Sequence, residues 1–229
     1  MIAVAAQGWF AHLDAQKWGE IALALKDTLV MLLLSFPLTV AVAIPLGLVL
    51  FLSGRAQPGT RPLLNAVVGF VVNVLRSVPF IILMICLIPL TLLVAGTSLG
   101  VKGAILPLVV GAAPFYARLV ETSLREVDRG VLEASQAMGA TTRQLIARVL
   151  LPEALPGLIA GATVTAIVLI GFTAMGGAIG SGGLGDLAYR EGYLRSRTDV
   201  ALVTVVLLVA MVQLVQFIGE RAAARFTRH

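Results

Sequence analysis

The side chains that most often catalyse reactions or bind metals are few and scattered in this sequence. Its two histidines, His12 and His229, lie near opposite termini without ligand-spaced partners, so no metal site is expected. The single cysteine, Cys86, lies in an apolar run and excludes an intrachain disulfide or a cysteine-based zinc cluster. The long uncharged runs contain no Asp, Glu or His, the residues that proton- or sodium-coupled carriers usually place inside their spans. These features argue against a membrane enzyme and against a secondary transporter.

A glycine-rich stretch, Gly180-Ser181-Gly182-Gly183-Leu184-Gly185, has the spacing of a dinucleotide-binding loop. That loop requires a preceding strand, a following helix and an acidic residue about 20 positions on. Here an apolar span precedes it and no acid lies near position 205. We interpret the glycines as tight turns that could form a gate, with a flexible loop as the alternative. Position alone makes the following residues candidates for the gate or pathway: Ser77, Met175, Gly176, Gly177 and Ser181.

The composition indicates where these residues must lie. Of the 229 residues, 59% are hydrophobic and 13% charged, and the mean hydropathy is +0.98. Soluble domains carry about 25% charged residues. The sequence therefore predicts an integral membrane protein. Its net charge of +5 indicates an arginine-rich cytoplasmic face rather than a nucleic-acid partner.

Long uncharged runs define the expected spans, since crossing a bilayer takes about 20 apolar residues. We predict an all-α protein with an N-terminal interfacial segment, 1–20, a transmembrane domain, 21–219, and a tail, 220–229. About five spans are expected, near 28–52, 70–95, 103–121, 154–174 and 200–219. The shorter apolar run Leu63–Leu75 is interpreted as a cytoplasmic lead into the second span, and a sixth span is the alternative. The segments that follow the first, third and fifth spans contain more Lys and Arg than the segments on the other side. The positive-inside rule therefore predicts that the N-terminus lies outside and the C-terminus in the cytoplasm. Arg76 and Arg118 then fall at cytoplasmic span ends, where Arg118 can pair with Glu121.

The polar stretch between the third and fourth spans is predicted to form two short helices within a coupling segment, 128–152. Asp128 can cap the first helix, and Gly139 can end it because glycine readily adopts positive φ. Thr141 and Gln144 have the spacing of a capping box for the second. That helix carries an apolar stripe, formed by Leu145, Ile146, Val149 and Leu150. The stripe either docks on a partner or packs beneath the chain's own spans.

This segment resembles the EAA signature of ABC importer permeases, Glu-Ala-Ala-x3-Gly-x9-Ile-x-Leu-Pro. The matching positions are Glu133, Ala134, Ser135, Gly139, Val149, Leu151 and Pro152. Ser135 stands for alanine and Val149 for isoleucine, and both changes are conservative.

Four further segments, 76–83, 110–115, 150–157 and 174–185, resemble the methionine-type permeases. The resemblance covers most of the chain but not residues 1–25. Osmoprotectant and phosphonate permeases share a related glycine-rich ending, so a permease for such a solute is the alternative.

The resemblance implies an ABC importer permease fold with a cytoplasmic coupling helix in a bacterial inner membrane. Two copies would pair, each on one cytoplasmic ATPase subunit, and an extracytoplasmic binding protein would deliver the substrate. ATP and Mg²⁺ would be held by the ATPase, and this chain would bind no cofactor. The first motif residues would form the contact with the ATPase, and the last ones would lead the chain back into the membrane.

Overall fold

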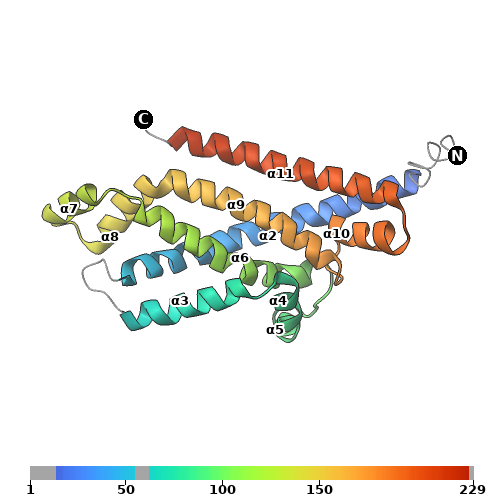
Figure 1. Cartoon of the computed structure of the whole chain (residues 1–229), viewed down its shortest axis with the longest axis horizontal. Coiled ribbons are helices and arrows are strands. Elements are labelled where there is room, and N and C mark those ends of the chain that lie inside the picture. Colours follow the sequence, from blue (N-terminus) through green and yellow to red (C-terminus); the bar gives the residue numbers. More distant parts are fainter. Residues whose placement is uncertain (1–13, 55–61, 227–229) are drawn as a thin grey trace. The chain divides into compact units, whose positions relative to one another are not determined.

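The computed structural model describes residues 14–54 and 62–226, and within these ranges every regular element is helical. This confirms the all-α prediction. Figure 1 shows the helices in chain order: α2 (Ala15–Ser53), α3 (Pro62–Ser77), α4 (Phe80–Cys86), α5 (Ile88–Ala95), α6 (Gly100–Arg125), α7 (Arg129–Ala137), α8 (Thr142–Leu145), the π-helix η1 (Ile146–Leu150), α9 (Leu151–Gly177), α10 (Gly183–Leu187), the π-helix η2 (Ala188–Leu194) and α11 (Thr198–Phe226).

In the described ranges, four helical segments are long and apolar enough to cross a membrane: Ala15–Ser53, Gly100–Arg125, Thr142–Gly177 and Thr198–Phe226. Helices α3 and α4 have 16 and 7 residues and qualify as a fifth span only when taken together, with a bend of 108° between their axes. The chain is therefore a multi-pass membrane protein with four to five spans.

The structure corrects the expectation of one helix over 70–95. Helix α3 already begins at Pro62 and ends at Ser77, and Pro79 has φ −55° and ψ 134°, outside the helical region. Proline lacks a backbone N–H, and its ring clashes with the carbonyl four residues earlier, so the helix breaks there. The run Leu63–Leu75 is thus a separate helix rather than a lead into the next one.

The other boundaries also differ from those expected. Helix α2 begins at Ala15, so part of the segment 1–20 belongs to it, while residues 1–13 lie outside the described ranges. Helix α9 continues past Ala174 to Gly177, and α11 continues past Gly219 to Phe226. Most of the expected tail, 220–229, is therefore helical as well.

Contacts between residues divide the chain into two units, and the boundaries of these units fall within the long helices. Unit 1 comprises Met1–Leu38, Val78–Gly111 and Ala166–Val215, and unit 2 comprises Thr39–Ser77, Ala112–Thr165 and Gln216–His229.

Unit 2 has its core between α6 and the first half of α9. Tyr116, Val120 and Leu124 are almost completely buried on α6, and the Tyr116 hydroxyl donates to the Leu158 carbonyl at 2.9 Å. Small residues bring the two helices close: a Cβ on Gly161 would lie 3.2 Å from the Leu119 Cβ. Gly157 and Gly161, four residues apart on α9, therefore serve packing within one chain.

Unit 1 contains a stacked aromatic pair and a helix cap supplied from a distant helix. The rings of Phe80 and Phe172 are parallel, with centroids 4.1 Å apart. The Leu184 amide at the start of α10 donates to the buried Thr28 hydroxyl of α2 at 2.8 Å. This bond supplies an acceptor to a helix N-terminus whose own N-cap residue, Gly182, has no side chain.

Candidate coupling surface and pathway residues

The coupling segment in unit 2 contains the two short helices predicted from its capping residues. The Asp128 side chain accepts a hydrogen bond from the Val131 amide at 3.2 Å, which caps α7. Gly139 adopts φ +79° and ends the turn after α7. Thr141 and Gln144 form the predicted capping box, with the Thr141 amide donating to the Gln144 Oε1 at 2.9 Å. Local hydrogen bonds thus fix both helix starts, and these predictions are confirmed.

The apolar stripe that follows packs inside the chain. Leu145 and Leu150 are buried in the same core as Tyr116 and Val120, and Ile146 and Val149 pack against it. Of the two alternatives for the stripe, the structure supports packing beneath the chain's own spans. The stripe therefore anchors the segment rather than docking a partner.

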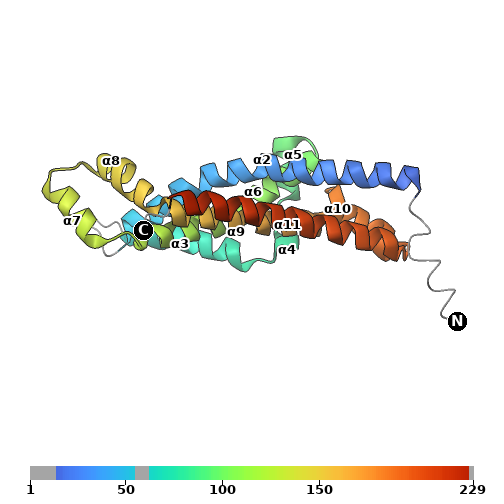
Figure 2. The same cartoon turned by 90° about the horizontal axis from the view of Figure 1, so that it is seen from above.

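The exposed side of the segment is the outer face of α7. Glu133, Ala134 and Gln136 are exposed there, and the Met138 side chain after the helix is 81% exposed. Figure 2, like Figure 1, shows α7 and α8 projecting beyond the last turn of α6 and the first turns of α9. An exposed thioether between two helices can adapt to an opposing surface.

The motif residues divide between these two sides. Glu133, Ala134 and Gly139 face outward, as does Pro152 at the second position of α9. Ser135 is buried, and its hydroxyl donates to the Val131 carbonyl at 2.8 Å. Val149 and Leu151 are partly buried against the core. The motif thus includes three residues that hold the segment and four that a partner could touch.

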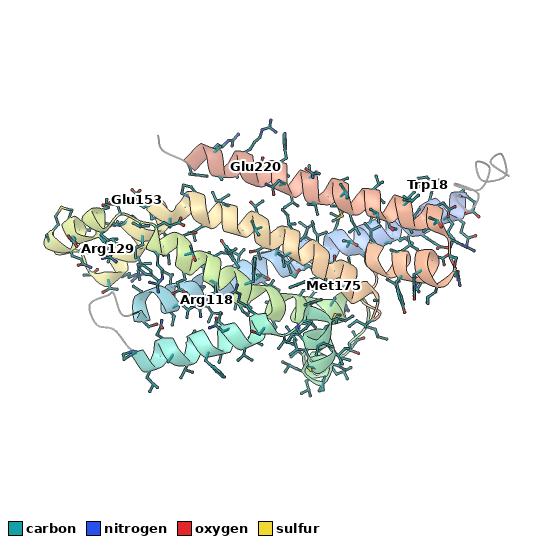
Figure 3. The ribbon with its side chains drawn as sticks, in the orientation of Figure 1. Trp18, Arg118, Arg129, Glu153, Met175 and Glu220 are labelled. Carbon is teal, nitrogen blue, oxygen red and sulfur yellow. The ribbon has the colours of Figure 1, made fainter. Side chains whose placement is uncertain are left out.

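Next to α7 lies a cavity of about 250 Å³ that three carboxylate residues line, Glu126, Asp128 and Glu153. In Figure 3, Glu153 is labelled at the start of α9 and Arg129 on α7. Asp128 uses its carboxylate as the cap of α7. The cavity gives this end of unit 2 a negative patch beside the outer face of α7.

The gate or pathway candidates fall in different units and are described separately. In unit 2, Ser77 is exposed at the end of α3, and its hydroxyl donates to the Asn73 carbonyl at 2.8 Å. In unit 1, Met175 is 52% exposed on α9, whereas Gly176 and Gly177 are buried. Ser181 is completely buried, and its hydroxyl has no hydrogen-bond partner in the described part of the chain.

The glycines around Ser181 serve close packing. A Cβ on Gly177 would collide with the Asp186 amide, and one on Gly176 would lie 2.9 Å from the Ser181 hydroxyl. Helix α9 extends to Gly177 and α10 starts at Gly183, so residues 178–182 between them lie outside a helix. The element before the glycine-rich stretch is thus helix α9 and not a strand.

Arg118 is paired as predicted, and it also ties α3 to α6. Its guanidinium lies 2.7 Å from the Glu121 carboxylate and donates to Asn73 Oδ1 at 2.9 Å and to the Gly69 carbonyl at 3.2 Å. Arg125 shares the same Glu121 carboxylate at 2.7 Å. Figure 3 labels Arg118 on α6. These contacts explain the presence of Gly69 and Asn73 in α3.

Arg76 differs from Arg118. It is exposed at the end of α3, and its guanidinium lies 5.9 Å from the centroid of the Phe115 ring. Within residues 14–54 and 62–226 it makes no ion pair. Arg76 lies near the end of α3 rather than at the start of a helix, because α3 begins fourteen residues earlier, at Pro62.

Unit 1 contains an ion-pair cluster that the sequence only partly indicated. The Glu191 side chain is 2% exposed and lies 2.7 Å from Arg197, 2.6 Å from Arg195 and 3.3 Å from Lys17 of α2. Burial alone would raise the pKa of Glu191, but the Lys17 hydrogen bond and the three positive charges hold it below its ordinary value. Spacing of four residues indicates the Arg195 pair, whereas no sequence signal identifies Lys17 as a partner.

The chain resembles known proteins over most of its length. Residues 43–229 match the family described as "Binding-protein-dependent transport system inner membrane component". The chain is 52% identical over 171 residues to the methionine import system permease protein MetP of Bacillus subtilis, covering 75% of this chain and 77% of that protein. It is 45% identical over 199 residues to the probable D-methionine transport system permease protein MetI of Vibrio cholerae, covering 87% and 88%.

A solved structure agrees with these sequence matches. A chain of the MetNI methionine ABC transporter in an inward-facing conformation superposes with a TM-score of 0.92 at 44% sequence identity. The match covers 94% of this chain and 100% of that chain.

Proposed function

Because this chain belongs to the family of binding-protein-dependent transport system inner membrane components, we propose that it is the permease subunit of an ATP-driven methionine importer. The observation that carries the proposal is 52% identity to a methionine import permease over three quarters of the chain. Osmoprotectant and phosphonate permeases share the glycine-rich ending, but the similar proteins named above are all methionine systems.

The proposed partner in the cytoplasm is an ATPase subunit that binds the outer face of α7. Glu133, Ala134 and Met138 are exposed there, while the neighbouring stripe is already covered by the chain's own core. A partner that bound this face would touch an anchored helix rather than a loose loop. ATP and Mg²⁺ belong to that partner, and this chain contributes movement and a pathway.

Packing in unit 2 suggests how a push on α7 would reach the membrane. The segment continues through η1 into α9 without a break, and Leu150 is completely buried against α6 residues. Closely packed interiors transmit displacement because they have little free volume. When the ATPase subunits close on ATP, α7 and α8 therefore carry the first half of α9 and the end of α6 with them.

The remaining assignments follow from the family resemblance and the charge distribution. Two copies of the chain pair around the pathway, and an extracytoplasmic binding protein delivers the substrate. The coupling segment, 128–152, faces the cytoplasm of a bacterial inner membrane. The N-terminus then lies outside and the C-terminus inside, in agreement with the positive-inside rule.

Copurification tests the ATPase partner. Tagged chain is purified from detergent-solubilised membranes, and a cytoplasmic ATPase at one copy per permease is expected by mass spectrometry. Glu133→Arg reverses a charge at the centre of the exposed face and should reduce the recovered ATPase at least tenfold. Glu220→Arg, at an exposed position on α11, is the matched control and should leave recovery unchanged. Full recovery with Glu133→Arg would refute the coupling assignment.

A further inference from the structure

Arg76 lies far from the cytoplasmic end of unit 2. It is the fifteenth residue of α3, so at 1.5 Å per residue it is about 21 Å along the helix from Pro62. Its neighbour Phe115 lies ten residues before the end of α6 at Arg125, or about 15 Å along that helix. The hydrocarbon core of a bilayer is about 30 Å thick. With Pro62 and Arg125 placed at the cytoplasmic edge of that core, as the proposed orientation requires, the Arg76 guanidinium lies near its midplane.

This guanidinium has no counter-ion among the described residues. It lies over the face of the Phe115 ring, with 5.9 Å between the ring centroid and the guanidinium carbon. Arg118, one turn further along α6, is satisfied by Glu121, Asn73 and Gly69. Arg125 takes the second oxygen of the same Glu121 carboxylate. The α3–α6 seam thus has three guanidinium groups and one carboxylate, and the surplus positive charge is at Arg76.

A charge at this depth is costly unless it faces water or an anionic partner. The Arg side chain is too short to reach an interface about 15 Å away, so snorkelling does not relieve the cost. Arg76 is exposed on the chain, and the exposed Ser77 hydroxyl is adjacent. The guanidinium presents a planar set of donors that matches a carboxylate in bidentate geometry.

We propose that Arg76 lines the aqueous translocation route and binds the α-carboxylate of the amino-acid cargo as it passes the bilayer midplane. This inference rests on the proposed function, because it requires a substrate with a free carboxylate. The Phe115 ring holds the guanidinium by a cation–π contact and leaves its N–H donors free. Ser77 lies beside the same stretch of the route.

The test uses Ser77→Cys as a reporter in a chain whose single cysteine has been replaced, Cys86→Ala. The purified permease–ATPase complex is treated with a water-soluble, charged methanethiosulfonate reagent, and labelling of the new cysteine is followed. Labelling is expected, because the position faces water. L-methionine should protect the cysteine at a concentration about tenfold lower than L-methionine amide, which lacks the carboxylate charge.

The same protection is then measured in Arg76 variants. With Arg76→Gln, methionine and its amide should protect at equal concentrations. Arg76→Lys, which keeps the charge but not the planar fork, should retain part of the preference. Arg225→Gln removes an exposed arginine on α11 and should keep the full preference. If Arg76 had a purely structural role, its substitution would change protection by both ligands alike. The ratio of the two protecting concentrations would then stay as in the wild type.

Two results would overturn the inference. One is a reporter that reacts with membrane-permeant N-ethylmaleimide but not with the charged reagent, since Ser77 would then face lipid. The other is a complex that retains Arg76 and in which methionine and its amide protect the reporter equally or not at all. ATPase copurification and methionine uptake into proteoliposomes, measured on the wild-type complex, test the proposed function separately.

Discussion

Gly139 offers a direct test of whether the turn between α7 and α8 controls coupling. Its φ is +79°, and a Cβ added there would meet nothing within 4 Å. The substitution Gly139→Ala therefore introduces backbone strain without a steric clash. An L-residue in the left-handed region costs about 1–2 kcal/mol. Reduced freedom of the unfolded chain offsets about 0.4–1 kcal/mol of this.

The net destabilisation of the turn is about 1 kcal/mol, which corresponds to roughly a fivefold change in its population. We expect faster hydrogen exchange at the amides that close the turn, Gly139 and Ala140. We also expect more ATP hydrolysed per methionine transported in proteoliposomes, because α7 would move less faithfully with α9. Gly139→Asn should be milder, since asparagine tolerates the left-handed region.

Gly171→Ala is the matched control. Gly171 is an exposed residue of α9 without a positive φ, and a Cβ there also meets nothing within 4 Å. Alanine should stabilise the helix at this position by up to about 1 kcal/mol. Suppose that Gly139→Ala had the hydrogen-exchange rates and the ATP consumption per transported methionine of the wild type, while Gly171→Ala raised the melting temperature. The assigned role of the turn would then be refuted.

Three further substitutions test the packing of the two units, each by the melting temperature of the detergent-solubilised complex. Glu191→Gln removes the carboxylate shared by Lys17, Arg195 and Arg197. It should lower the free energy of unfolding by about 2 kcal/mol. This is less than the roughly 3–5 kcal/mol typical of a fully buried pair, because the arginines are partly exposed. The pKa of Glu191 is held below its ordinary value of 4.5. The stability that the wild type gains from this cluster should therefore persist above pH 4.5 and be lost as the pH falls further. A Glu191→Gln variant whose melting temperature fell with pH in the same way as that of the wild type would contradict the role of the cluster. Gly161→Leu should cost about 1–3 kcal/mol by overpacking against Leu119 and Tyr116, and an unchanged melting temperature would mean that the helices can separate freely. Arg118→Gln should cost about 2 kcal/mol, and Arg118→Lys should not restore it, because an ammonium group cannot bond Glu121, Asn73 and the Gly69 carbonyl together.

Local signals in the sequence predicted the coupling segment well. Asp128, Gly139 and the Thr141–Gln144 pair form the caps expected of them, because capping depends on residues within one turn of each other. The Arg118–Glu121 pair was predictable for the same reason. Spacing of three or four residues on a helix determines which side chains meet.

Features that depend on distant residues were not predictable in this way. Hydropathy treated 70–95 as one span because it averages over the break at Pro79, where the axes of α3 and α4 differ by 108°. The contact between Arg76 and the Phe115 ring depends on how α3 packs along α6. The Lys17–Glu191 pair joins residues on α2 and η2 that are far apart in the chain. Each of these needed the fold before it could be seen.

The π-helix η1 has a consequence for how this segment tolerates change. Its five residues, Ile146–Leu150, lie between α8 and α9, and the second residue of α9 is Pro152, which cannot donate a backbone hydrogen bond. A π-turn contains one residue more than an α-turn. Deleting a single residue there would let the segment wind as an α-helix, in which four residues turn through nearly the same angle as five residues of a π-helix. The face that carries Glu133 and Met138 would then keep nearly its present direction. The π-helix therefore lets the chain hold one residue more or one residue fewer between Gln144 and Pro152 without turning the exposed face of α7.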